Sequence, residues 1–277
     1  MSEGFVLFAD GEEYVKQSYL SALSIKSSKN HKPVCLITST EVNSRYKKAF
    51  DHVIDIPWYK KDDTDLKVNN RWKVYHATPF DKSIVLDSDT LILQNLDYFW
   101  NYLNNYDLYF PSKVFTYRQE LINEAKNPYR KAFRANNLPN LYNAVHFFRK
   151  CDVAQEFFKW VELVTNNWEL FYGDFCKNYF PKQPSMDITV SIVSKILNCD
   201  TTITNNVQDI PNLVHMKSQI QNWRSGISRW QDRVGVYINQ ECELKIGNHR
   251  QSTIFHYTEN DFCSENIIKK YEKHLCM

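Results

Sequence analysis

With 277 residues, of which 43% are hydrophobic and 15% aromatic, the chain can bury one large core and is neither a disordered protein nor a coiled coil. Its 34 Lys and Arg nearly balance 32 Asp and Glu, and no basic stripe indicates nucleic-acid binding. No apolar stretch approaches the roughly 20 residues of a membrane helix, and no secretory signal pattern is present, so we expect a cytoplasmic protein without a transmembrane segment. Seven scattered cysteines fit reduced thiols better than a disulfide framework.

The first part of the chain alternates short apolar runs with segments of helical periodicity. We expect strands at residues 4–9, 33–38, 52–56 and 83–86, and helices at 12–26, 42–50 and 68–77. This alternation predicts an α/β fold with a mostly parallel central sheet flanked by helices. Beyond residue 225 we expect three short strands and a closing helix, at 234–238, 243–246, 253–257 and 264–274. The sequence therefore predicts a catalytic domain over 1–224 and a small C-terminal hairpin and helix extension over 225–277, packed on the same domain.

Two aspartates follow the fourth predicted strand directly. Asp87 and Asp89 stand at alternate positions after residues 83–86, at the carboxyl edge of the sheet, where open α/β sheets bind ligands. Alternate residues of an extended segment point the same way, about 6.5–7 Å apart. Both carboxylates can therefore converge on one divalent cation, which would neutralise charge as a diphosphate leaves.

The sequence around this pair resembles a known family. Residues 83–99, SIVLDSDTLILQNLDYF, are similar to the signature segment of glycogenin-like glycosyltransferases, in which an acidic D-x-D precedes a T-L-(V/I)-L-x-N run. The resemblance implies a GT-A-type, Rossmann-like fold and a metal-dependent enzyme that moves a sugar from a nucleoside-diphosphate sugar to an acceptor hydroxyl. It further implies a UDP-sugar donor, retention of configuration, Mn²⁺ (or Mg²⁺) as cofactor, and a glycan, protein or small molecule as acceptor.

The resemblance also implies a nucleotide-binding set. The first predicted strand and its turn are similar to the family's nucleotide-contacting region, which places Phe8, Asp10 and Tyr14 beside the base. Arg71 falls where the family has a cation near the diphosphate, a role that suits a guanidinium because it forms bidentate, charge-assisted hydrogen bonds. Ser88, between the two aspartates, completes this set. A solvated helix charge is the alternative for Arg71.

Two later residues are candidates for contact with the donor sugar. Residues 142–148 resemble the family's F-N-S-G-V-F strand, which makes Asn143 a candidate for hydrogen bonds to sugar hydroxyls, although Ala and Val replace the family's Ser and Gly. Asp187 lies where similar enzymes carry an Asp-Gln pair, with Ile188 in place of the Gln. We expect Asn143, Asp187 and Arg71 to act in catalysis. An Asn at a strand start and an Asp at a helix N-cap are the alternatives.

Glycogenin-like enzymes add a histidine from a late strand to the metal site, and two histidines here compete for that place. His215 ends a predicted strand and keeps the family's spacing of eight residues to Trp223. His256 ends another apolar strand in the tail. An imidazole beside two carboxylates suits Mn²⁺ better than oxygen ligands alone. We favour His215, with His256 as the alternative, and Lys217 is a candidate to supply positive charge to the phosphates.

Two other classes of function stay open. Aspartyl-phosphate phosphohydrolases also place Asp-x-Asp-x-Thr after a strand, and would use Asp87 as nucleophile and Asp89 as acid and base. That motif normally follows the first strand, however, and Thr90 stands one place too early for it. The second alternative is a catalytically inactive protein that binds a nucleotide-sugar, which the replaced family positions permit.

Two features outside the motifs bear on access to the site. Residues 112–139 are polar and basic, and we expect either a mobile lid over the donor or a permanently ordered pair of surface helices. Aromatic residues crowd several loops, including Trp58 and Tyr59. Because aromatic faces stack on sugars, this is compatible with a carbohydrate acceptor, while packing in the core or at its rim is the alternative.

Overall fold

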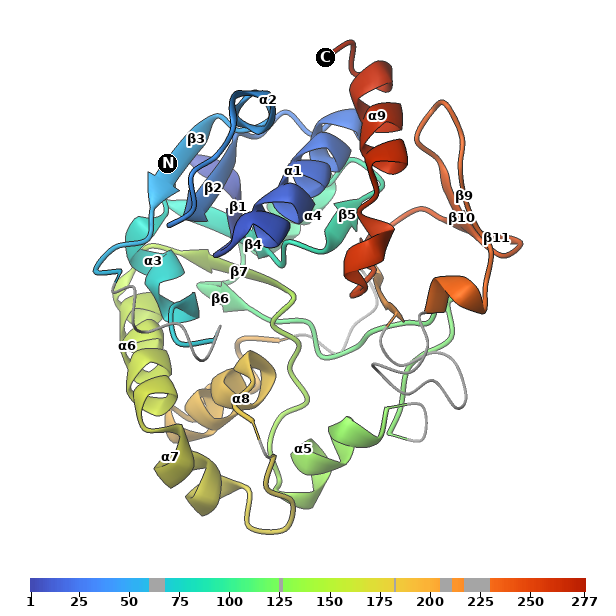
Figure 1. Ribbon diagram of the computed structural model, residues 1–277. Coiled ribbons are helices and arrows are strands. Elements are labelled where there is room, and N and C mark those ends of the chain that lie inside the picture. Colours follow the sequence, from blue (N-terminus) through green and yellow to red (C-terminus); the bar gives the residue numbers. More distant parts are fainter. Residues whose placement is uncertain (60–67, 125–126, 182, 205–210, 217–229) are drawn as a thin grey trace.

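A six-stranded sheet forms the centre of the protein (Figure 1). The computed structural model describes residues 1–59, 68–124, 127–181, 183–204, 211–216 and 230–277. The strands lie in the order β3-β2-β1-β4-β7-β6, and neighbouring strands are parallel except that β7 is antiparallel to both β4 and β6. Their bounds are β1 Glu3–Phe8, β2 Val34–Thr38, β3 His52–Asp55, β4 Lys82–Leu86, β6 Leu108–Tyr109 and β7 Val145–Arg149.

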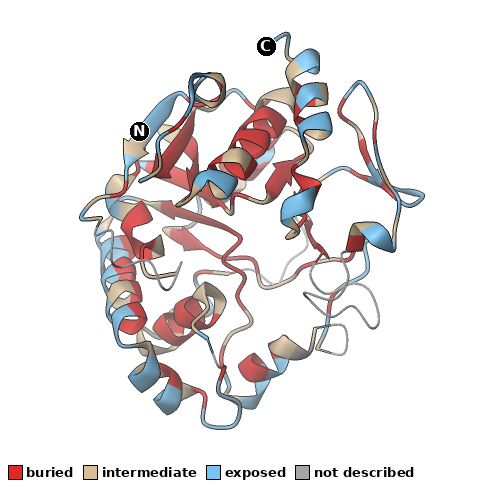
Figure 2. Cartoon of the chain, in the orientation of Figure 1, coloured by how far each residue is buried: buried red, intermediate tan, exposed pale blue. Residues whose placement is uncertain are grey.

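Helices cover both faces of this sheet (Figure 1). Because successive strand residues point to opposite faces, Phe5 and Leu7 of β1 pack into one apolar cluster and Val6 and Phe8 into the other. The first cluster includes α1 (Glu12–Ser27), α4 (Asp97–Leu103) and α9 (Glu265–His274), and the second includes α6 (Asp152–Asn166), α7 (Trp168–Phe175) and α8 (Met186–Ile196). Strands β1, β2 and β4 are buried almost throughout, whereas the edge strand β3 is largely exposed (Figure 2).

The predicted α/β class is confirmed, and the predicted elements of the first part recur with shifted bounds. The expected helix at 42–50 is shorter, α2 (Ser44–Lys47), and begins after Asn43, whose side chain accepts a hydrogen bond from the Tyr46 N–H. The expected helix at 68–77 is a 3₁₀ turn, η1 (Arg71–Lys73), that continues into α3 (Val74–Ala77). The preceding Asn69 and Asn70 favour turn conformations over helix, which explains the later start.

A second, three-stranded sheet joins distant parts of the chain beside the carboxyl end of β4. Its order is β5-β12-β8, with β5 Thr90–Ile92, β12 Ile254–His256 and β8 Leu213–His215. Strand β12 is antiparallel to β5 and parallel to β8, so His256 is paired with Thr90 on one side and with His215 on the other. His256 therefore ends its strand beside Thr90, the residue after Asp89, and His215 ends the next strand beside His256.

The remaining C-terminal elements form a small third sheet and the helix α9. The sheet order is β11-β10-β9, with β9 Val236–Ile238, β10 Leu244–Ile246 and β11 His249–Gln251. Helix α9 packs against α1, and its Glu272 accepts hydrogen bonds from Arg45 and from the Tyr19 hydroxyl, with Nε–Oε1 and O–O distances of 2.7 Å each. The predicted boundary at residue 224 lies within 217–229, outside the described residues.

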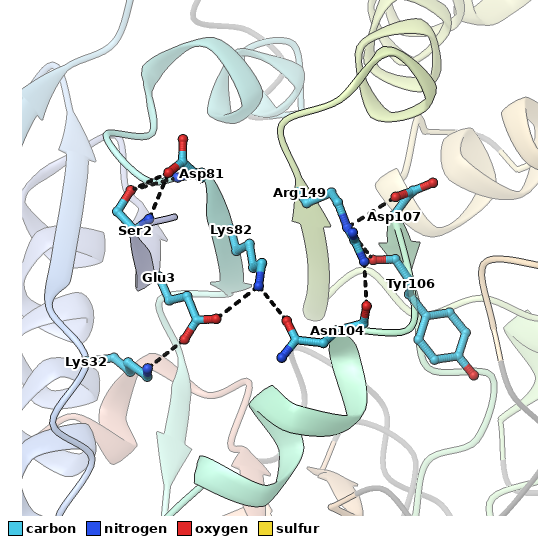
Figure 3. A network of polar contacts seen from close by, with 9 residues as sticks. All are labelled: Ser2, Glu3, Lys32, Asp81, Lys82, Asn104, Tyr106, Asp107 and Arg149. Atoms are coloured by element: carbon cyan, nitrogen blue, oxygen red, sulfur yellow. Dashed lines mark hydrogen bonds and ion pairs between the residues drawn. The ribbon is translucent and has the colours of Figure 1, made fainter.

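The amino end of the central sheet carries a network of polar contacts (Figure 3). The ammonium of Lys82, at the start of β4, lies 3.2 Å from Glu3 and 2.6 Å from Asn104, and Lys32 lies 2.6 Å from the same glutamate. Arg149, at the end of the antiparallel β7, donates to the carbonyl groups of residues 104 and 106. Charge at this end is thus largely paired within the protein.

Among the described helices, none is long and apolar enough to cross a membrane.

Candidate functional site

The two aspartates lie in the short connection between β4 and β5, where the central sheet meets the second sheet. The Asp87 N–H donates to the carbonyl oxygen of Ala144, which precedes β7, at 2.8 Å. The Asp89 carbonyl accepts from the Tyr257 N–H, just after β12, at 3.0 Å. Backbone hydrogen bonds to two different sheets therefore hold this connection in place.

The carboxylates converge with a histidine. His256 Nε2 lies 3.0 Å from Asp89 Oδ2 and 4.0 Å from Asp87 Oδ2. Among the described residues, these three side chains form a group whose ligand atoms all lie within 4.8 Å of one another. His215 lies beside them, with its ring centroid 4.8 Å from that of His256, but it is not part of that group. Two carboxylate oxygens and an imidazole nitrogen fit a divalent cation such as Mn²⁺.

Arg71 reaches the same group from the turn η1. Its Nη1 donates to Asp87 Oδ1 at 2.7 Å, and both side chains are mostly buried. Burial raises the pKa of the Asp87 carboxyl, but the neighbouring Arg71 and His256 outweigh burial and hold that pKa below its usual value. Asp87 is thus kept ionised, the form in which a carboxylate binds a cation.

A cavity of about 630 Å³ opens above these residues, a volume within the range of about 300–1,000 Å³ that is usual for small-molecule sites. Among the described residues it is lined mainly by polar side chains and by Tyr14 and Tyr142. On one wall, the Ser88 hydroxyl donates to Gln17 Oε1 at 3.1 Å, and Gln17 Nε2 donates to Asn260 Oδ1 at 2.8 Å. This chain of hydrogen bonds fixes polar groups next to the aspartates.

The residues predicted to bind the nucleotide occupy different places. Tyr14, Arg71 and Ser88 line the cavity. Phe8 is buried in the core at the end of β1, and Asp10 accepts a hydrogen bond from the Ser39 hydroxyl; within the described part of the chain, neither belongs to the cavity lining. Lys217 lies outside the described residues.

Asn143 and Asp187 meet on the opposite wall of the cavity. The Asn143 N–H donates to Asp187 Oδ1 at 2.7 Å. Asp187 stands in the first turn of α8, but the N-cap of this helix is Ser185, whose hydroxyl accepts from the Ile188 N–H. The alternative that Asp187 caps the helix is therefore wrong. Its carboxylate instead accepts the hydrogen bond from the Asn143 N–H.

Arg130, which is not itself in the cavity lining, pairs with Asp187 of this wall, and the sequence alone did not single it out. Only 4% of its side chain is exposed, its Nη2 donates to Asp187 Oδ2 at 2.5 Å, and its guanidinium lies 3.5 Å from the ring centroid of Tyr142. It belongs to residues 112–139, the segment predicted as a lid, where it ends the turn η2 (Pro128–Arg130) before α5 (Lys131–Ala135). Nothing local in the sequence distinguishes it from the other basic residues there.

Comparison with known proteins shows the fold. No protein-family model matches the sequence, and no curated protein matches it. The galactosyltransferase LgtC, solved with donor and acceptor sugar analogues, aligns over 99% of this chain and 96% of its own, with a TM-score of 0.51 and 13% identity. An active-site mutant of LgtC aligns over 99% and 95% with the same score and identity. Mouse xyloside xylosyltransferase 1 aligns over 94% and 99%, with a TM-score of 0.49 and 13% identity. The chain has the GT-A-type fold of these LgtC structures, as the sequence predicts.

Proposed function

We propose that this protein is a metal-dependent glycosyltransferase that moves a sugar from a nucleoside-diphosphate sugar to an acceptor hydroxyl. One observation carries the proposal: Asp87, Asp89 and His256 converge in a cavity at the carboxyl end of β4 in a GT-A-type fold. The sequence predicted the two aspartates and named His256 as the second choice for the histidine. On this geometry, we assign His256 as the third ligand and His215 as its neighbour.

The chemistry of the leaving group follows from these side chains. A divalent cation, Mn²⁺ or Mg²⁺, held by the two carboxylates and the imidazole would neutralise charge on a departing diphosphate. Arg71, fixed by its hydrogen bond to Asp87, adds a guanidinium at the same place. Because these charges are held in position before the reaction, they stabilise the developing negative charge without reorganisation.

The opposite wall is assigned to the donor sugar. Asp187 is held by the Arg130 guanidinium and by the Asn143 N–H, one on each carboxylate oxygen. These contacts set the positions of Asn143 and Asp187, which we propose to hydrogen-bond the sugar. Tyr14 and Ser88, on the other side of the cavity, are proposed to bind the nucleotide.

The finer assignments rest on the resemblance of residues 83–99 to glycogenin-like enzymes. It supports a UDP-sugar as donor and transfer with retention of configuration. The acceptor is proposed by class only, as a hydroxyl of a glycan, protein or small molecule. Phosphoryl transfer to Asp87 is disfavoured, because one of its oxygens is occupied by Arg71 and the aspartate follows the fourth strand of the fold, not the first.

The proposal is tested by donor turnover. The purified protein is incubated with Mn²⁺ and UDP-glucose, UDP-galactose, UDP-N-acetylglucosamine or GDP-mannose, and nucleotide release is measured with and without EDTA. We expect metal-dependent release from one donor, abolished by Asp89→Asn. Asp81→Asn is the matched control, because Asp81 lies exposed at the amino end of β4, and it should leave release unchanged.

Three outcomes would contradict the proposal in different ways. Nucleotide release that is as fast in Asp89→Asn as in wild type would show that Asp89 does not hold a metal that the reaction needs. Donor binding without any turnover would support the inactive binding protein. Metal-dependent phosphate release from p-nitrophenyl phosphate would support the phosphohydrolase.

A further inference from the structure

A second cavity lies beside the turn that carries Arg71. It measures about 430 Å³ and is lined, among others, by Trp58, Asn70, Trp72, His76, Glu162 and Asn166. Residues 68 and 71 line the first cavity, while residues 69, 70, 72 and 73 line the second. A single short segment therefore separates the two cavities. The volume of the second cavity also falls within the range of about 300–1,000 Å³ that is usual for small-molecule sites.

Trp58 is the most unusual residue of this cavity. The residue is 64% exposed, and its φ of 51° lies in the left-handed region, which costs a bulky residue about 1–2 kcal/mol. The backbone is held in this conformation by Lys73, a buried residue whose ammonium donates to the Trp58 carbonyl at 3.1 Å. Backbone strain of this kind clusters at functional sites, ligand-binding sites among them.

Two neighbouring rings hold the indole in place. Trp58 stacks on the buried Trp72, with ring centroids 6.1 Å apart and an interplanar angle of 18°. His76 contacts the Trp58 ring edge-on, at 5.2 Å between centroids. Trp72 and His76 thus hold the indole in place, and Trp58, an exposed residue of the cavity lining, forms an aromatic platform there.

The polar residues around the platform select the kind of ligand. Asn70 and Asn166 offer amides that donate and accept hydrogen bonds, and Glu162 offers a carboxylate that accepts them. Sugar hydroxyls suit these groups, because each hydroxyl can both donate and accept a hydrogen bond. A phosphorylated ligand does not suit them, because Glu162 would repel a phosphate and the Lys73 ammonium is buried and already bonded to the Trp58 carbonyl.

We propose that this second cavity is a binding site for a pyranose ring of a neutral glycan, with Trp58 as its stacking platform. The negative face of an indole attracts the weakly positive C–H groups on one face of a pyranose, while the hydroxyls at the rim bond the amides and Glu162. The site binds sugar without a metal or a nucleotide, so it goes beyond the proposed transfer and can be tested even if the protein transfers nothing.

The test uses protein labelled with 5-fluorotryptophan, which carries one fluorine in each of its seven tryptophans. Loss of one resonance in Trp58→Phe assigns Trp58. The labelled full chain is then titrated, in EDTA, with maltotetraose, cellotetraose, mannotetraose and N-acetylchitotetraose, and separately with AMP. We expect a saturable shift of the Trp58 resonance with at least one oligosaccharide.

Variants measured by calorimetry complete the test. Trp58→Ala should weaken binding of that oligosaccharide by about tenfold or more, the effect of removing a stacking aromatic, whereas Trp58→Phe should bind within about threefold of wild type. Tyr237→Ala is the matched control, since Tyr237 is 60% exposed on β9, and should bind like wild type. The inference is overturned if no oligosaccharide shifts the resonance up to about 20 mM, if Trp58→Ala binds normally, or if AMP binds more tightly than every sugar.

Discussion

At the scale of single residues, the two histidines that end β8 and β12 differ in what they reach. His256 Nε2 lies 3.0 Å from Asp89, while His215 contacts the ring of His256. We expect His256→Ala to weaken Mn²⁺ binding by about 10- to 100-fold or more, by analogy with the losses seen when a residue next to a ligand is removed. His215→Ala should weaken it less. Mn²⁺ affinity of each variant, followed by the loss of the free-ion EPR signal, checks this, and the reverse order would return the site to His215.

Arg130 is predicted to matter for stability because it is buried opposite Asp187. Removing its charge in Arg130→Met leaves the Asp187 carboxylate partly buried without its ion pair, and we expect a loss of about 2–3 kcal/mol in the free energy of unfolding. Arg134→Met is the control, because Arg134 is 78% exposed and its pair with Glu124 should contribute less than about 1 kcal/mol. Urea unfolding of the two variants measures the difference, and equal losses would show that Arg130 does not support the cavity wall.

His146 gives the fold a specific dependence on pH. It lies on β7, its Nδ1 is 3.0 Å from the Asn143 carbonyl oxygen, and its Nε2 is buried without a hydrogen-bond partner in the described part of the chain. Burial lowers the pKa of His146 to about 4. The folded protein thus holds this ring neutral, while the unfolded chain binds a proton near the ordinary pKa of about 6.5.

The sign of the effect follows from proton linkage. Between the two pKa values the unfolded state binds more protons, so stability is full above about pH 6.5 and falls as the pH drops toward 4, by up to about 3 kcal/mol. His146→Phe should remove this part of the pH dependence, and His31→Gln, which changes an exposed histidine, should not. Urea unfolding at pH 5 and pH 7.5 measures it. An identical pH dependence in wild type and His146→Phe would contradict the assignment.

At the scale of elements, strand β12 links the C-terminal residues 230–277 to the site, because it carries His256 and pairs with β5 and β8. Phe255, at its centre, is fully buried between β5 and β8. We expect Phe255→Ala to cost about 3–5 kcal/mol of unfolding free energy. Tyr237→Ala, on the exposed side of β9, should change it by no more than about 0.5 kcal/mol. Urea unfolding compares the two. A small effect at Phe255 would mean that residues 230–277 form an accessory unit.

The elements also show which parts of the fold a single sequence can predict. Strands β1, β2 and β4 are continuous apolar runs, and α6 carries a clear apolar stripe, so local periodicity is sufficient for them. The short sheet β5-β12-β8 is different, because its three-residue strands pair residues that are about 40 and about 165 positions apart in the sequence. Its pairing depends on tertiary packing that no local pattern contains.

The same distinction explains the site. Asp87 and Asp89 were predictable because they follow a recognisable strand, and the end of a strand fixes its edge of the sheet. The choice of His256 required the pairing of β12 with β5. The ion pair between Arg130 and Asp187 joins side chains 57 residues apart, and the sequence offers no signal that selects one basic residue among the many in that segment.

At the scale of the whole molecule, the two ends of the central sheet have different roles. At the amino end, Glu3 forms ion pairs with both Lys32 and Lys82 (Figure 3). At the carboxyl end, the carboxylates of Asp87 and Asp89 face a cavity together with Arg71 and His256. The charges at the amino end pair with one another, whereas those at the carboxyl end line the cavity that we propose to bind a cation and an anionic donor.

The central claim is that this cavity binds a nucleoside diphosphate through a divalent cation. Calorimetric titration of UDP and GDP into wild type and Asp89→Asn, each with Mn²⁺ and with EDTA, tests it most directly. We expect at least one of the two nucleotides to bind wild type at least about tenfold more tightly with Mn²⁺ than with EDTA, and Asp89→Asn to lose this difference. Equal affinity with and without metal in wild type, or a metal dependence that Asp89→Asn retains, would contradict it.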